Sequence, residues 1–288
     1  MEKIGFVILH YGDLSVTSQC IRSILSMDGR EKAEIILVDN DSGDATDDKW
    51  EMYAGISGLH ILKNEEAHGF SHANNLGYRY ARNVLKADCI LILNNDIEFI
   101  QKDFIRRLED SAVRTGGHII APDIRKQSSL EPQNPLDTRI RTEAEAIRTI
   151  ILNRAALLCF PVIYPVLLRQ QKRADRNRVR RKKENREYYR MPHEGIVPFG
   201  ACLIFTKPFI DGQEDAFMPE TEFYYEEYLL ADRCFREGYR ICYDPSLRIL
   251  HETGKATEKS TGSEKNKMRF MMENTAESCR IYLRELRK

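Results

Sequence analysis

The sequence predicts an α/β protein in which a mostly parallel sheet is flanked by helices and interrupted by one basic helical insertion. Short apolar segments alternate with amphipathic ones through residues 4–122, as in β-α-β units. Polar clusters follow three of the apolar segments, at 39–44, 63–75 and 94–96. The alternation stops at 125–193, where an apolar stretch is followed by a run of arginine and lysine.

The apolar segments are short, rich in Ile, Leu and Val, and do not alternate with polar residues, which is typical of strands buried on both faces. We expect strands, in order, at 4–9, 34–38, 59–62, 89–93, 119–122, 197–205, 239–243 and 247–250. Apolar residues at helical spacing predict helices at 15–27, 45–54, 72–85, 102–114, within 217–236 and at 264–288. Asp44 or Thr46 would cap the second helix, and Gly238 would end the fifth.

Composition limits the class of protein. We interpret the 288 residues as one domain, with 125–193 as an amphipathic and basic insertion and 258–288 as a helical tail. The 44 basic and 44 acidic residues balance, so nothing global points to nucleic acid as a partner. The seven cysteines are scattered without a C-x-x-C pair, which predicts reduced thiols and a cytoplasmic location. The first residues lead directly into a strand, so we expect no signal peptide.

The carboxyl ends of parallel strands meet at one edge of a sheet, where open α/β sheets bind ligands. The strand at 89–93 runs straight into Asn94, Asn95 and Asp96, and a carboxylate there can hold a divalent cation. A turn at the end of a strand would explain the same residues. The chain has neither G-x-G-x-x-G nor a P-loop, so phosphates bound at this edge would need a metal ion to neutralise them.

Six segments, in chain order, resemble the motifs of family-2 glycosyltransferases of the GT-A fold. They are 38–42 (VDNDS), 64–77 (NEEAHGFSHANNLG), 93–97 (LNNDI), 199–203 (FGACL), 225–228 (YEEY) and 243–251 (YDPSLRILH). The resemblance extends over roughly residues 4–122 and 195–257. It is nearest to the branch that transfers rhamnose or a hexose in capsule, O-antigen and related cell-wall polysaccharides.

The resemblance implies metal-dependent, inverting transfer of a sugar from a UDP- or dTDP-linked donor to a saccharide or lipid-linked acceptor. It implies that Asp96 and His251 bind the metal, and mixed oxygen and nitrogen ligands suit Mn²⁺ or Mg²⁺. Glu227, with Glu226 as second choice, would take the proton of the acceptor hydroxyl. The nucleotide-sugar site would contain His10, Tyr11, Asp39, Asn40, Ser42, Asn64, Gly69, Phe70, Asn74, Asn75 and Asn95.

Two positions depart from the family pattern. Asn94 stands where the metal motif usually has Asp, and the acid pair has Glu where Asp is commoner. Simpler explanations stay open: His251 would then be an ordinary residue at the end of a strand, and the two glutamates first-turn acids favoured by the helix dipole. The alternative functions are a degenerate transferase that serves as a membrane scaffold, and a sugar-phosphate nucleotidyltransferase, whose Gly-rich phosphate loop is missing.

Residues 147–168 form the most apolar part of the chain and approach the roughly 20 residues of a membrane span. The residues that interrupt this stretch are Arg148, Asn153, Arg154, Pro161 and Pro165. Basic residues then crowd 169–190, and an apolar segment beside a basic run is a two-signal membrane attachment. We therefore expect 147–190 to contact anionic lipid at the inner face of the cell membrane. A helix packed on its own domain, a disordered loop and a homo-oligomer are left open.

Overall fold

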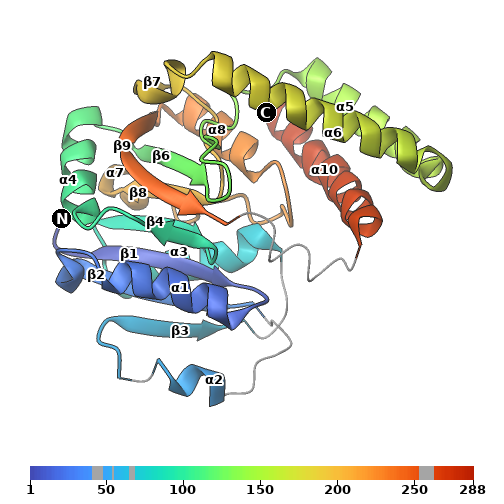
Figure 1. The fold of residues 1–288 in the computed structure, drawn as a ribbon. Coiled ribbons are helices and arrows are strands. Elements are labelled where there is room, and N and C mark those ends of the chain that lie inside the picture. The colour runs from blue at the N-terminus through green and yellow to red at the C-terminus, as the bar shows by residue number, and fades with distance from the viewer. Residues whose placement is uncertain (41–47, 54, 65–68, 253–262) are drawn as a thin grey trace.

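The computed structural model describes residues 1–288 except 41–47, 54, 65–68 and 253–262. Within these residues a nine-stranded sheet has the order β3-β2-β1-β4-β8-β6-β9-β5, with β7 paired to β9 (Figure 1). The strands are β1 (Ile4–His10), β2 (Ala33–Asp39), β3 (Leu59–Lys63), β4 (Cys89–Asn94), β5 (Ile97–Phe99), β6 (Ile119–Lys126), β7 (His193–Glu194), β8 (Cys202–Thr206) and β9 (Ile241–His251). The helices are α1 (Leu14–Leu25), α2 (Asp48–Glu51), α3 (Phe70–Asn83), α4 (Phe104–Thr115), α5 (Glu143–Leu158), α6 (Phe160–Glu184), α7 (Lys207–Gly212), α8 (Glu226–Glu237) and α10 (Glu264–Leu286).

The sheet is mostly parallel, as the β-α rhythm predicts. Strands β3, β2, β1 and β4 are parallel, and so are β6 and β9, whereas β8, β5 and β7 run antiparallel to their neighbours. The register sets His10 opposite Asp39 and Leu9 opposite Asn94. The polar residues that end β1, β2 and β4 therefore meet at one edge of the sheet.

Two apolar cores lie on the two faces of the sheet. Helices α1, α2 and α4 contribute to one core, and α3, α7 and α8 to the other, which also contains one buried residue of α5 and two of α10. Helix α3 can lie close to the sheet because Gly77 has no side chain, and a β-carbon there would overlap Val7 Cγ1 and come within 2.9 Å of Val38 Cγ2. Gly238 ends α8 in the left-handed conformation, as predicted.

The second half of the chain corrects several predicted boundaries. The strand expected at 197–205 begins only at Cys202, so the residues before it form a loop. The two short strands expected at 239–243 and 247–250 are one strand, β9, whose register with β6 shifts between Pro122 and Asp123. Such an irregularity bends a strand without ending its pairing. Helix α2 is shorter than expected, and its predicted caps lie outside the described residues.

The insertion and the tail pack together at one side of the sheet, where Figure 1 shows α5, α6 and α10. The apolar stretch 147–168 is divided between α5 and α6, which meet at Cys159, with Pro161 tolerated in the first turn of α6. The predicted tail helix is α10, and it packs on α5 and on the start of α8. No helix in the described part of the chain is long and apolar enough to cross a membrane.

The close packing of α3 gives a stability prediction. Gly77→Ala should lower the free energy of unfolding by about 1–3 kcal/mol, because overpacking against Val7 outweighs the helix propensity gained from alanine. Chemical denaturation measures this change. Val84→Ala, an exposed change at the end of the same helix, is the control and should shift the free energy by less than about 0.5 kcal/mol. Equal stability of the two variants would contradict the packing argument.

Candidate active site

The edge formed by β1 and β4 holds a small buried hydrogen-bond network. His10 is fully buried, and its Nδ1 lies 2.7 Å from Thr17 Oγ1 of α1. Asn95 Nδ2 donates to the same hydroxyl, over 2.9 Å, and to the carbonyl oxygen of Tyr11, over 3.2 Å. Three residues predicted for the nucleotide-sugar site are thus joined through Thr17, which fixes the loop after β1 against the end of β4.

The residues predicted to bind the nucleoside lie at the ends of β2 and β3. Asp39 accepts a hydrogen bond from Trp50 Nε1 over 3.2 Å. Asn64 donates from its side chain to Asn40 Oδ1 over 2.8 Å, and from its backbone to the carbonyl of Asp39 over 2.9 Å. The structure therefore brings Asp39, Asn40 and Asn64 together, and their binding of a nucleoside stays a prediction. Ser42 lies outside the described residues.

Gly69 and Phe70 of the 64–77 motif contact the segment that leads to α8. A β-carbon at Gly69 would overlap Glu222, and Phe70 N donates to Glu222 O over 2.6 Å. The ring of Phe70 packs on Phe217, at 5.6 Å between centroids. These residues of the motif therefore pack against the loop 217–222, which leads to α8, and hydrogen-bond to it.

The two asparagines of this motif, Asn74 and Asn75, are buried. Asn75 uses both polar atoms of its amide on the backbone of Phe217, with two hydrogen bonds of 2.9 Å. Asn74 donates to the carbonyl oxygen of Phe70 over 2.9 Å. Sequence reasoning assigned both to the nucleotide sugar. In the structure Asn75 ties α3 to the loop at Phe217, and its contact with a nucleotide sugar stays a prediction.

Asp96 and His251, 155 positions apart in the sequence, are neighbours at the end of β9. The pairing of Ile97 with His251 sets them side by side, and His251 Nε2 lies 3.1 Å from Asp96 Oδ1. That oxygen is buried and makes no hydrogen bond within the described residues. His251 Nδ1 donates to Gln133 Oε1 over 2.8 Å, which leaves the Nε2 lone pair facing Asp96.

This pair fits a divalent cation. Two ligands of one octahedral ion lie about 3 Å apart, and a hydrogen bond that holds the other ring nitrogen is the usual support of a metal-binding histidine. The described residues contain no group of three or more His, Cys, Asp or Glu side chains that could hold a metal. Diphosphate and water oxygens would therefore have to complete the shell. Asn94, the atypical position of the motif, donates its backbone N–H to Ala201 O over 3.0 Å.

The predicted acid pair opens α8 and is buried. Tyr224 and Tyr225, directly before it, both have φ of 64°, a left-handed conformation that costs free energy in a bulky residue and is often found at functional sites. Glu227 Oε1 accepts the N–H of Gly200 over 3.1 Å. Glu226 Oε2 is buried and has no hydrogen-bond partner in the described part of the chain.

Burial raises the pKa of both carboxyl groups. The pKa of Glu226 lies well above its ordinary value because the group is desolvated and faces the negative charge of Glu227. Burial also raises the pKa of Glu227, but its own backbone N–H and that of Gly200 favour the charged form. Glu227 therefore ionises first, and Glu226 keeps its proton beside it. A carboxylate and a carboxylic acid can act differently in one site.

A short loop, Phe199–Gly200, contacts two pairs of predicted site residues. We call Asp96 and His251 the metal pair, and Glu226 and Glu227 the acid pair. The Phe199 ring lies 5.8 Å from the His251 ring, centroid to centroid, and the next residue, Gly200, donates to Glu227. Ala201 accepts from Asn94. The loop is short of space, because a β-carbon at Gly200 would lie 3.0 Å from Glu227 Oε1.

Sequence reasoning missed four residues that shape this site. Thr17 is a buried hydroxyl on an apolar helix face, and Trp50 is the only tryptophan of the chain, so each carried a weak signal. Gln133 and Asn134 lie in a segment without any pattern. Asn134 accepts from Phe199 N over 2.9 Å and donates to Pro122 O over 2.9 Å.

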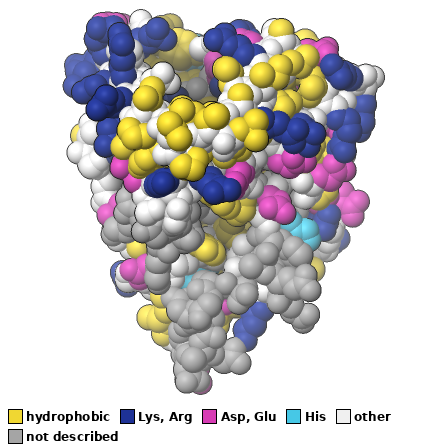
Figure 2. All heavy atoms as spheres, turned by 90° about the vertical axis from the view of Figure 1, so that its right-hand side faces the viewer, with side chains coloured by type: hydrophobic (Ala, Val, Ile, Leu, Met, Phe, Trp, Pro, Cys, Tyr) yellow, Lys and Arg dark blue, Asp and Glu magenta, His cyan; other side chains and the backbone are white. Residues whose placement is uncertain are grey.

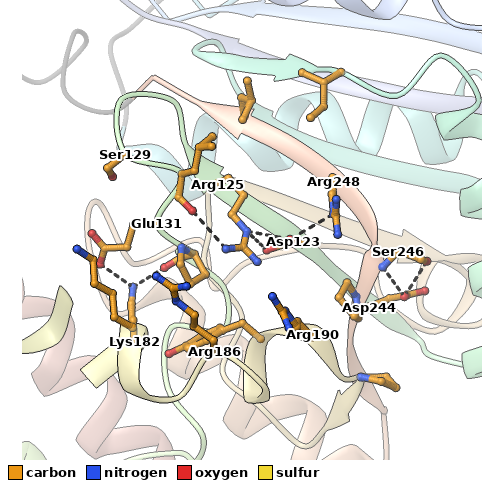
Figure 3. A pocket seen from close by; sticks show the side chains of 18 of the residues that line it. Asp123, Arg125, Ser129, Glu131, Lys182, Arg186, Arg190, Asp244, Ser246 and Arg248 are labelled. Atoms are coloured by element: carbon orange, nitrogen blue, oxygen red, sulfur yellow. Dashed lines mark hydrogen bonds and ion pairs between the residues drawn. The ribbon is translucent and has the colours of Figure 1, made fainter. Parts of the chain in front are cut away.

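A separate cavity of about 1010 Å³ lies between β6, β9 and the C-terminal end of α6 (Figure 3). Seven basic and three acidic side chains line it, and none of its lining residues is one predicted for the nucleotide or metal. Each acid is paired: Asp123 with Arg125, Asp244 with Arg114 and Glu131 with Lys182. Of these ion pairs, only Lys182–Glu131 ties the end of α6 to the segment that follows β6.

Comparison with known proteins identifies the family. The model of Glycosyl transferase family 2 matches residues 6–209, so the chain belongs to this family. The low-salt glycan biosynthesis hexosyltransferase Agl10 of Haloferax volcanii is 31% identical over 113 residues, which are 38% of this chain and 35% of that protein. The match thus spans about a third of the relative's length.

Two solved structures share the fold. The mannosyltransferase PcManGT from Pyrobaculum calidifontis has a TM-score of 0.56 at 13% identity, over 96% of this chain and 73% of that one. S. aureus TarS 1–349 has a TM-score of 0.53 at 13% identity, over 87% of this chain and 60% of that one. Together with the family match, these likenesses confirm the predicted GT-A fold class.

The raised pKa values give a pH prediction. The folded state binds the Glu226 proton more tightly than the unfolded chain does, so this stabilisation is complete below the ordinary pKa of 4.5 and is lost as pH rises through the raised pKa. Glu226→Gln should remove that loss. From about pH 5 to 8 its free energy of unfolding should fall less steeply than that of the natural chain, by up to about 1.4 kcal/mol per pH unit.

Urea unfolding across this pH range measures the slope. Glu237→Gln, at the exposed end of the same helix, is the control and should follow the natural chain. Parallel curves for Glu226→Gln and Glu237→Gln would show that Glu226 is not held protonated by burial.

Proposed function

We propose that this chain is a metal-dependent, inverting glycosyltransferase that moves a sugar from a nucleotide diphosphate to a saccharide or lipid-linked hydroxyl acceptor. One observation carries the proposal: the loop Phe199–Gly200 touches both His251 of the metal pair and Glu227 of the acid pair. The residues proposed to hold the metal and diphosphate and the residue proposed to accept a proton thus contact the same short loop. Membership of glycosyl transferase family 2 supports the reaction class.

The donor would lie along the edge of β1, β2 and β4. Asp39 and Asn40 would bind the nucleoside, with Trp50 holding Asp39 in place. Asp96 and His251 would hold Mn²⁺ or Mg²⁺, which when bound stabilises the negative charge that develops on the departing diphosphate. Gln133 fixes the tautomer of His251, and Asn95 keeps the loop after β1 closed on the site.

Glu227 would accept the proton of the acceptor hydroxyl as the acceptor oxygen attacks the anomeric carbon and the bond to the diphosphate breaks. The Gly200 N–H keeps Glu227 oriented and favours its charged form. Glu226, protonated beside it, lowers the local negative charge that would repel the donor. One displacement with one base inverts the anomeric centre.

The donor sugar is a further part of the proposal. The name of the Haloferax relative, a hexosyltransferase of glycan biosynthesis, supports a hexose over rhamnose, and a role in cell-surface glycan synthesis. The Pyrobaculum structure holds GDP-mannose and Mn²⁺, so guanosine donors belong in a screen beside UDP- and dTDP-linked sugars. A role in capsule synthesis stays a prediction.

Replacing the proposed base tests the reaction. Glu227→Gln should lower kcat by about 10²–10⁴-fold with little change in the KM for the donor, because only proton transfer is removed. Gly200→Ala should lower kcat less, because its β-carbon displaces Glu227 without removing it. Nucleotide release, measured with a panel of donors and acceptors, reports turnover, and Glu237→Gln should leave it unchanged. If Glu227→Gln kept full activity and Glu226→Gln lost it, Glu226 rather than Glu227 would be the base.

The metal pair is tested by binding alone. Isothermal titration with UDP, dTDP and GDP should show tighter binding when Mn²⁺ is present, and Asp96→Asn and His251→Gln should each abolish that difference. Gln133→Leu should weaken it by about 10–100-fold through loss of support for His251. His60→Gln, near the start of β3 and away from the carboxyl edge of the sheet, should leave that difference intact. If the natural chain bound nucleotide with the same affinity with and without Mn²⁺, the proposed roles of Asp96 and His251 would be contradicted.

A further inference from the structure

The outer face of the α5–α6 hairpin is apolar and has no partner among the described residues. Its large aliphatic side chains are 52–86% exposed, and they are Ile151, Leu152, Leu158, Val162 and Val166. We call these five residues the hairpin patch. Figure 2 shows apolar side chains gathered on this side of the molecule, with lysine and arginine beside them. Contiguous apolar surface of this kind marks an interaction site.

The same stripe of α6 becomes cationic further along. Val162 and Val166 are followed at the helical spacing of one face by Arg169, Arg173 and Arg176. All three arginines are exposed, and none has an acidic partner in the part of the chain that the structure describes. One face of α6 therefore presents aliphatic groups in its first turns and guanidinium groups in the next, over about 20 Å at 1.5 Å per residue.

The opposite face of α6 is anchored, which fixes the direction of the patch. Phe160 packs against Met268 and Met272 of α10 in a small apolar core. At the other end of the helix, Lys182 Nζ donates to Pro132 O over 2.6 Å and lies 3.6 Å from Glu131, beside the cavity of Figure 3. Phe160 and Lys182 lie on the side of α6 opposite Val162 and Val166 by helical spacing, so these two anchors leave the α6 part of the hairpin patch facing away from the body of the protein.

We propose that the hairpin patch and these arginines bind the surface of an anionic lipid membrane, with α6 lying in the plane of the interface. Lipid offers acyl chains to the aliphatic half of the stripe and phosphate groups to the arginine half. A second copy of the chain is a poorer partner. A two-fold contact would oppose the arginines either to arginines or to the apolar half.

Arg141 links the start of the hairpin to the residues beside the acid pair, so membrane binding at the hairpin would be transmitted to the candidate active site through this residue. This residue lies just before α5, donates to Tyr225 Oη over 2.9 Å, and stacks over the Tyr228 ring at 4.7 Å. The hairpin is thus joined to the residues that flank the acid pair. That the membrane presents a lipid-linked acceptor to Glu227 rests on the proposed function, whereas the membrane binding itself does not.

Vesicle flotation tests the binding without any nucleotide. The natural chain should float with vesicles of phosphatidylcholine and phosphatidylglycerol at 7:3, and far less with phosphatidylcholine alone. Leu158→Ser/Val162→Ser and Arg169→Gln/Arg173→Gln should each weaken binding about tenfold or more. The controls are Val84→Ser/Val113→Ser, exposed aliphatics elsewhere, and Lys183→Gln/Arg186→Gln, which changes the net charge equally from residues lining the cavity. Both controls should bind within about threefold of the natural chain.

Cys159 gives an independent readout at the tip of the hairpin. It is exposed whereas the other six cysteines are buried, so an environment-sensitive fluorophore can be attached there alone. Its emission should shift to the blue with anionic vesicles and stay unchanged with neutral ones. Unshifted emission, equal binding by the patch variants and their controls, or a dimer in solution that the patch variants dissociate would overturn the proposal. Because flotation needs no turnover, an inactive chain that binds vesicles would refute only the proposed function.

Discussion

The hydrogen bond from Gly200 N–H to Glu227 is the interaction on which the site depends. Two carboxyl groups buried side by side are unfavourable unless one is protonated and the other has donors. Glycine at 200 lets the backbone come close enough to donate. Of the two strained tyrosines directly before α8, Tyr225 is contacted by Arg141 and by Tyr282 of α10. The insertion and the tail therefore both contact the start of the helix that carries the predicted acid pair.

The mixed sheet explains why this contact lies beside the metal pair. Strand β8 is inserted antiparallel between β4 and β6, so the loop before β8 crosses the carboxyl edge where β1, β2 and β4 end. Strand β9 runs parallel to β6 and reaches the same edge at His251. A purely parallel sheet would have put the start of β8 at the opposite edge, far from Asp96.

The two sides of helix α6 differ in character. Its inner face is apolar towards α10 and is tied by Lys182 near its end, whereas its outer stripe changes from aliphatic to cationic. Residues 147–168, the most apolar stretch of the sequence, are divided between two helices that meet at Cys159. Pro161 lies in the first turn of α6, where proline is tolerated, whereas Pro165 lies inside the helix.

The sequence by itself determined the strands and helices of the first half, the polar ends of β1, β2 and β4, and the family motifs, because periodicity and turn chemistry are local. Tertiary structure decided which parts of the chain those residues contact. Asn75 and Gly69 look like ligand contacts in sequence, yet they hold the loop 217–222. Gln133 has no signal in sequence, yet it orients His251. Partners more than 100 positions apart are set by strand order and register, which no local pattern encodes.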